Sequence, residues 1–167
     1  MSGAYPFGRA RSTFYLGFDG GGPLPSGVPV LAYGANASPE ALERKLPGAR
    51  AAALAARLRD FAVVHSAHLS PYGAVPATIV PAPGAEEPVH VLLLDAEDQT
   101  RLDATEPNYR RVRLHGIELE ADRLGALGAV DAYVSRHGPL VADGEPVPLG
   151  ARPQEELRAL LGVARVP

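Results

Sequence analysis

Asp103 and Glu106 are the two side chains whose types and spacing best suit acid–base chemistry. They stand three positions apart in residues 102–110, between a polar segment expected to be a short helix and a strand expected to begin near Tyr109. A carboxyl group held where a helix turns into a loop beside apolar strands can be partly desolvated and can act as a general base. Most such pairs are exposed acidic turns, so the spacing alone leaves both interpretations open.

A glycine turn at residues 31–39, Leu-Ala-Tyr-Gly-Ala-Asn-Ala-Ser-Pro, is a second candidate site. An apolar strand ends at Gly34, and Ser38 can cap a helix that begins at Pro39. Backbone N–H groups between the strand and the positive end of the helix can point in one direction and hold a carboxylate or a phosphate. A plain connection between a strand and a helix fits the same spacing.

Several other kinds of site are disfavoured by the sequence. The glycine run at residues 20–22 is followed by Pro23 and Pro25, which prevent the helix that a phosphate-binding loop requires. There is no Gly-x-Ser-x-Gly motif of the hydrolase type. The chain has no cysteine, and its five histidines are scattered. We therefore expect neither a metal site nor a cofactor.

The composition restricts the class of protein. The chain has 167 residues, 46% of them hydrophobic and 21% charged, which fits one globular domain. A net charge of −3 offers no electrostatic basis for nucleic-acid binding. No apolar stretch is long enough for a membrane helix, and the N-terminus has no basic flank followed by an apolar core, as a secretory signal would. We expect a cytoplasmic protein that binds neither nucleic acid nor membrane. Lys45 is the only lysine beside fifteen arginines, which we attribute mainly to genomic composition.

The elements that must position these residues are mostly short strands. A polar or capped pattern predicts three helices, at residues 39–46, 95–102 and 152–161, and alanine-rich residues 49–60 also have helix propensity. Apolar runs separated by Gly and Pro predict the strands; these runs are residues 28–33, 61–65, 77–80, 89–94, 109–119 and 129–135. Many short strands with few helices indicate an α+β fold.

The N-terminal 27 residues carry half of the aromatic side chains and end in a Gly/Pro-rich linker. These aromatic residues are Tyr5, Phe7, Phe14, Tyr15 and Phe18. Disordered tails have few aromatic residues, so we predict an ordered segment that packs on the body of the protein or on a neighbouring subunit in a homodimer. The sequence accordingly divides into an N-terminal extension, residues 1–27, and a main domain, residues 28–167.

Three short motifs, taken in order along the chain, resemble the gamma-glutamylcyclotransferase-like family. Residues 32–36, Ala-Tyr-Gly-Ala-Asn, are similar to its tyrosine-glycine-serine-asparagine loop. Residues 77–81, Ala-Thr-Ile-Val-Pro, resemble its Ala-Thr-Ile strand. Residues 102–106, Leu-Asp-Ala-Thr-Glu, followed by 109–112, Tyr-Arg-Arg-Val, resemble its Leu-Asp-x-x-Glu and Tyr-x-Arg elements. The likeness covers residues 28–134.

The resemblance implies a compact α+β domain in which a mixed, barrel-like sheet with a few short flanking helices surrounds a pocket. It implies a strand at residues 51–58, against the helix propensity of their alanines. The implied activity is that of a cofactor-independent cyclotransferase, in which the α-amine of a γ-glutamyl amine or peptide attacks its own γ-carbonyl and releases pyroglutamate and an amine. Glu106 would be the acid/base. The implied substrate-binding residues are Tyr33, Gly34, Ala35, Asn36, Tyr109 and Tyr133.

Three positions depart from the family pattern. Ala35 stands where the family has serine, Pro107 stands where it commonly has glycine, and Val89 lies in a strand that often carries a glycine near the pocket. A non-catalytic ligand-binding or protein-interaction domain of the same fold is therefore the alternative. The two hypotheses differ in whether Glu106 lies in a pocket beside residues 34–36.

Overall fold

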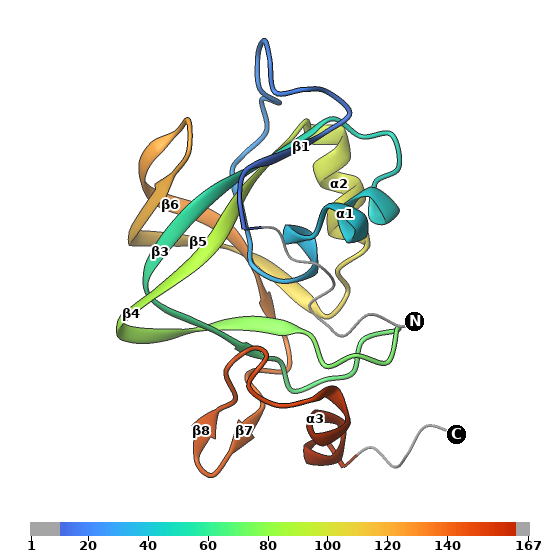
Figure 1. The fold of residues 1–167 in the computed structure, drawn as a ribbon, viewed down its shortest axis with the longest axis vertical. Helices are drawn as coiled ribbons and strands as arrows, with labels where there is room; N and C mark the ends of the chain where they lie inside the picture. Colours follow the sequence, from blue (N-terminus) through green and yellow to red (C-terminus); the bar gives the residue numbers. More distant parts are fainter. Residues whose placement is uncertain (1–10, 163–167) are drawn as a thin grey trace.

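The computed structural model describes residues 11–162 (Figure 1); Tyr5 and Phe7 lie outside this range. The strands are β1 (Phe14–Leu16), β2 (Val30–Ala32), β3 (Ala51–His65), β4 (Ala77–Leu94), β5 (Tyr109–Ala121), β6 (Gly125–Ser135), β7 (Val141–Ala142) and β8 (Glu145–Pro146). The helices are α1 (Pro39–Lys45), α2 (Ala96–Ala104) and α3 (Gln154–Leu160), with a 3-10 turn η1 (Ala35–Ala37) before α1. The three helices predicted from capped and polar patterns are confirmed.

Five strands close into a mixed β-barrel, which confirms the predicted α+β, barrel-like fold. The strand order is β3-β4-β2-β6-β5, and β5 pairs back with β3. The pairing of β2 with β6 is parallel, whereas the other pairings in the barrel are antiparallel. No helix among residues 11–162 is long and apolar enough to cross a lipid bilayer.

Apolar side chains form one core inside the barrel and a second core beneath the helices. Leu31, Leu58 and Val91 belong to the barrel core and are almost fully buried. Leu42 of α1 and Leu102 of α2 are completely buried in the second cluster, which fastens both helices to the sheet. Burial of each such side chain stabilises the fold by about 1.5–3 kcal/mol.

Residues 49–60 do not form the helix that their alanines favour; β3 runs through them, as the family resemblance implies. Ala51 and Ala53 pack into the cluster beneath α1 and α2, whereas Ala52 and Leu54 pack into a cluster covered by the N-terminal segment. Because both faces of this part of β3 are buried, the sequence lacks the polar alternation of a half-exposed strand. Tertiary packing therefore overrides the local propensity.

A single strand, β4, replaces the two strands predicted at residues 77–80 and 89–94. Pairing with β3 continues past a register shift between Arg59 and Phe61. At this bend Asp60 has a φ of 65° and its Oδ1 accepts a hydrogen bond of 2.9 Å from the N–H of Gly84, whose φ is 84°. A bulge thus lets the paired strands change direction without separating.

The prolines between the two predicted strands do not interrupt β4. Pro81 and Pro88 lie where β4 pairs with β3, Pro83 lies within the register shift, and all three precede the pairing with β2 that begins at His90. Proline is tolerated in strands whose second edge is open, because the missing N–H can face away from the partner. The sequence rule that prolines separate strands is wrong at this edge.

The described part of the N-terminal segment packs on the main sheet of its own chain. Strand β1 pairs antiparallel with β3, Phe14 opposite Ala53. The guanidinium of Arg50 lies over the ring of Phe18, 4.2 Å from its centroid, and Nη1 of Arg123 donates a hydrogen bond of 2.7 Å to the carbonyl of Gly20. The homodimer suggested for this segment stays a prediction.

The C-terminal part supports the loop between β3 and β4, residues 66–76. Leu157 of α3 and Leu140 pack against Val75 in a separate core cluster, and Oε1 of Gln154 accepts a hydrogen bond of 2.7 Å from the N–H of Val75. Figure 1 shows α3 and the β7–β8 hairpin below the end of the barrel where this loop runs. The loop is therefore held from beneath.

Candidate functional site

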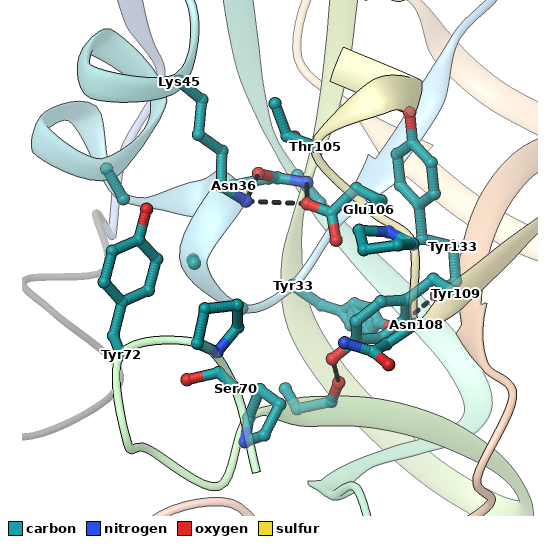
Figure 2. Close-up of a pocket in the computed structure, with 18 of the residues that line it drawn as sticks. Tyr33, Asn36, Lys45, Ser70, Tyr72, Thr105, Glu106, Asn108, Tyr109 and Tyr133 are labelled. Carbon is teal, nitrogen blue, oxygen red and sulfur yellow. Dashed lines mark hydrogen bonds and ion pairs between the residues drawn. The ribbon is translucent and has the colours of Figure 1, made fainter. Parts of the chain in front are cut away.

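A pocket of about 340 Å³ lies between α1, the turn after β2, the loop at residues 66–76 and the segment after α2. All seven residues that the family resemblance implies for the site line this pocket (Figure 2). They are Tyr33, Gly34, Ala35, Asn36, Glu106, Tyr109 and Tyr133. The fold thus brings together residues that lie up to one hundred positions apart in the sequence, as Tyr33 and Tyr133 do.

The turn at residues 33–38 has the strand–turn–helix form predicted from its sequence. The N–H of Ala37 donates to the carbonyl of Gly34 at 3.0 Å, and the N–H of Ser38 to that of Ala35 at 2.9 Å. Oγ of Ser38 accepts a hydrogen bond of 3.4 Å from the N–H of Ala41 and so caps α1. Gly34 has a φ of −125°, so glycine is not required there for a left-handed backbone.

Glu106 follows α2 directly, and its backbone continues the helical hydrogen bonding for one more turn. The N–H of Glu106 donates to the carbonyl of Asp103 at 3.1 Å, and Pro107 then turns the chain. The Glu106 side chain is only 10% exposed and lies in the pocket that residues 34–36 also line. A partly desolvated carboxylate beside a backbone turn is therefore present.

Lys45 and Asn36 hold one oxygen of the Glu106 carboxylate. Nζ of Lys45 lies 2.7 Å from Oε1 of Glu106 and 2.8 Å from Oδ1 of Asn36, and Nδ2 of Asn36 lies 3.4 Å from the same Oε1. Both contacts of Glu106 engage Oε1, and Figure 2 shows its other oxygen directed toward the open centre of the pocket. Sequence reasoning missed Lys45, although its being the only lysine of the chain was a signal.

Tyr133 is held by two polar side chains of α2. Its hydroxyl donates to Oδ1 of Asp103 and accepts a hydrogen bond of 2.7 Å from Nε2 of Gln99. Burial, together with the hydrogen bond to Asp103, raises the pKa of Tyr133 far above its ordinary value. Its phenol therefore stays neutral. Asp103, the first carboxylate of the acidic pair, contacts Tyr133 and so fixes the position of this pocket-lining ring.

The other two tyrosines of the pocket are anchored to backbone carbonyls. The Tyr33 hydroxyl donates to the carbonyl of Tyr133, and the Tyr109 hydroxyl donates to the carbonyl of Ala77 at 2.8 Å. Both phenol oxygens are thus engaged at the barrel wall, so the rings shape the pocket. The Ala-Thr-Ile strand motif contributes to the site through this contact of Ala77.

His68 is a pocket-lining residue that sequence reasoning had set aside. Its ring stacks on that of His137 at a centroid distance of 4.6 Å, and its Nδ1 lies 2.6 Å from Oγ of Ser66. Burial, with a smaller contribution from the neighbouring charge of His137, lowers the pKa of His68 to about 4. Its imidazole is therefore neutral at neutral pH.

The lowered pKa of His68 predicts a loss of stability in acid. An unfolded chain gives this group its ordinary pKa near 6.5, so the native state binds fewer protons and the free energy of unfolding falls as the pH drops from 6.5 to about 4. At about 1.4 kcal/mol for each pKa unit, the loss approaches about 3 kcal/mol. In urea unfolding at pH 7 and pH 4.5, His68→Gln should reduce the difference in stability. The exposed His115→Gln should not, and equal differences in the two variants would refute the prediction.

Tyr72 and Arg44 form the outer rim of the pocket. Tyr72 is 71% exposed, and the guanidinium of Arg44 lies 5.7 Å from the centroid of its ring. Of the three departures from the family pattern, Ala35 and Pro107 line the pocket. Val89 instead packs in the barrel core, so it does not narrow the pocket directly.

Among residues 11–162, no three His, Cys, Asp or Glu side chains are grouped so that they could hold a metal ion. The polar groups directed at the pocket are instead the Glu106 carboxylate, the Lys45 ammonium and the Asn36 amide. This set can bind a small zwitterionic molecule and move a proton at the Glu106 carboxylate.

Comparison with known proteins gives structural neighbours only: neither a family model nor a curated protein matches the sequence. One neighbour is an uncharacterised human protein, with a TM-score of 0.55 and 20% identity over 81% of this chain and 76% of that chain. Another is a gamma-glutamyl cyclotransferase, with a TM-score of 0.55 and 19% identity over 80% of this chain and 75% of that chain. The predicted resemblance is thereby confirmed in three dimensions. The chain has the gamma-glutamylcyclotransferase-like fold.

Proposed function

We propose that this protein is a cyclotransferase that converts a γ-glutamyl amine or peptide into pyroglutamate and a free amine. The observation that carries the proposal is the Glu106 carboxylate, 10% exposed, in the pocket that the turn at residues 34–36 also lines. The pocket volume of about 340 Å³ is at the small end of the range for small-molecule sites. A γ-glutamyl compound has a size and charge distribution suited to it.

The turn would hold the substrate and Glu106 would move the proton. Backbone N–H groups of residues 34–36 bind the α-carboxylate, which places the α-amine over the γ-carbonyl carbon. Glu106 takes a proton from the α-ammonium, and the freed amine forms a new C–N bond to the γ-carbonyl carbon. The α-nitrogen loses its second proton to solvent as the lactam forms. The original γ-amide C–N bond breaks, and the proton taken by Glu106 balances the one that the departing amine requires.

Release of pyroglutamate tests the proposal directly. Purified protein is incubated with a γ-glutamyl dipeptide and with a γ-glutamyl alkylamide, and pyroglutamate and the free amine are quantified by mass spectrometry. We expect the two products in equal amounts, because the reaction is an intramolecular displacement. Glutamate in place of pyroglutamate would indicate hydrolysis and would contradict the mechanism.

A non-catalytic ligand-binding domain is the second candidate, and the Lys45 ion pair on Oε1 of Glu106 favours it. An ammonium at 2.7 Å stabilises the ionised carboxylate and can serve simply to neutralise it in a binding site. Isothermal titration separates the candidates, because a binding domain would bind a γ-glutamyl amide stoichiometrically and leave it intact after prolonged incubation.

Gly34→Val should abolish binding of pyroglutamate or glutamate at the pocket. Glycine at position 34 would let the ligand approach the backbone closely, and a branched side chain would fill that space. Ala35→Ser should be tolerated, because it adds a hydroxyl without removing a backbone donor. Isothermal titration measures both variants. Unchanged affinity in a folded Gly34→Val protein would place the carboxylate site elsewhere.

A further inference from the structure

Lys45 is an exception to the basic composition of the chain. Fifteen of the sixteen basic residues are arginine, so a position that needed only a positive charge would be expected to carry arginine as well. The single lysine instead lies in the pocket with its Nζ 2.7 Å from Glu106. An ammonium differs from a guanidinium in being compact and in being able to release a proton, whereas arginine keeps its proton in proteins.

The local structure fixes the position of the Lys45 ammonium in the pocket. Lys45 is the last residue of α1, whose start is fixed by the cap at Ser38. Its side chain is 17% exposed and reaches both Oε1 of Glu106 and Oδ1 of Asn36. Two acceptors use two of the three ammonium protons, and the third is available to a bound molecule.

We propose that Lys45 is the general acid of this site, and the proposal rests on the cyclotransferase function proposed above. Glu106 takes one proton from the α-ammonium of the substrate, the α-nitrogen forms its bond to the γ-carbonyl carbon, and this nitrogen then loses its second proton to solvent. As the γ-amide C–N bond breaks, Nζ of Lys45 gives one proton to the leaving nitrogen. The proton on Glu106 then crosses the 2.7 Å contact to Nζ. Both groups are restored: one of the two protons lost by the α-nitrogen has in effect reached the leaving amine, and the other has gone to solvent.

The use of separate groups as base (Glu106) and acid (Lys45) indicates the class of substrate. A basic aliphatic amine departs poorly as an anion and therefore requires a proton in the transition state, whereas an electron-poor aniline can leave without one. A dedicated acid is useful only for the first kind of leaving group. The site therefore suits γ-glutamyl amides of alkylamines and amino acids.

Two substrates and two variants test the proposal. The probes are γ-glutamyl butylamide and γ-glutamyl p-nitroanilide, and the variants are Lys45→Arg, which keeps the charge, and Lys45→Met, which keeps the unbranched stem. Pyroglutamate release is measured at saturating substrate, and melting temperatures are measured in parallel. We expect both variants to lose about 10²-fold or more on the butylamide and less than about 10-fold on the anilide.

Three outcomes would overturn the assignment. Retained activity of Lys45→Arg on the butylamide would show that the site needs only the positive charge of Lys45. Equal losses of activity on the two probes would show that Lys45 serves in binding or folding. If the wild-type protein releases pyroglutamate from neither probe, both the proposed function and the assignment of Lys45 are wrong. Glu106→Gln is the control for the function itself. If the wild-type protein turns over both probes and Glu106→Gln turns over neither, the proposed function holds even where the Lys45 variants contradict the assignment of the general acid.

Discussion

Glu106→Gln should reduce pyroglutamate release from a γ-glutamyl amide by about 10²–10⁴-fold, which is the usual contribution of a positioned acid or base. The amide has the size and polarity of the carboxylate, and its oxygen can still accept the hydrogen bond that Nζ of Lys45 makes at 2.7 Å. It cannot take a proton from the α-ammonium. The chemical step is therefore lost while the packing around the side chain is kept.

The melting temperature and a second glutamate provide the controls for this experiment. Glu118→Gln changes a side chain that is 71% exposed and lies outside the pocket, so its activity should match that of the wild-type protein. The melting temperature of Glu106→Gln should hardly move, because the amide fills the same volume and its oxygen keeps the hydrogen bond from Nζ of Lys45. Full pyroglutamate release by Glu106→Gln would refute the proposed acid/base.

Removal of residues 1–22 should lower the free energy of unfolding by about 3 kcal/mol or more, because it uncovers apolar surface. Strand β1 pairs with β3, and Tyr15 and Phe18 cover the cluster that contains Ala52 and Leu54. For a chain of this length, about 3 kcal/mol corresponds to a fall of roughly 10 °C in melting temperature. Differential scanning calorimetry measures the change.

A shorter deletion isolates the part of the segment that the structure describes. Comparison of the variants lacking residues 1–10 and residues 1–22 assigns the additional loss of stability to β1 and the aromatic residues that follow it. Light scattering on the same samples tests the predicted homodimer. Equal melting temperature, mass and activity in the full chain and in the 1–22 deletion would make the segment an inert tail.

The parts of the fold and site that could be predicted from sequence are those set by local chemistry. Ser38 and Pro39 predict the start of α1 through their preferences for the first positions of a helix, and the structure shows that cap. The position of Glu106 between a polar helix and a strand was likewise readable from nearby residues. These features depend on contacts within a few positions, so a pattern along the chain contains them.

The features that sequence reasoning missed depend on contacts between distant segments. The alanines of β3 look helical because nothing local shows that the helices and the N-terminal segment will cover the two faces of the strand. Lys45 and Glu106 are 61 positions apart, and Tyr133 meets Gln99 and Asp103 only when the barrel closes. The solitary lysine was visible in the composition, but its meaning required the ion pair.

The stretch of β4 that carries Pro81, Pro83 and Pro88 has a consequence for how copies of this protein behave together. An exposed strand edge with regular N–H and C=O groups can recruit the edge of another molecule and start aggregation. Each proline lacks the backbone N–H that such pairing uses, and the bend at Gly84 interrupts the flat surface. This stretch of β4 is therefore poorly suited to pairing with a strand of another molecule.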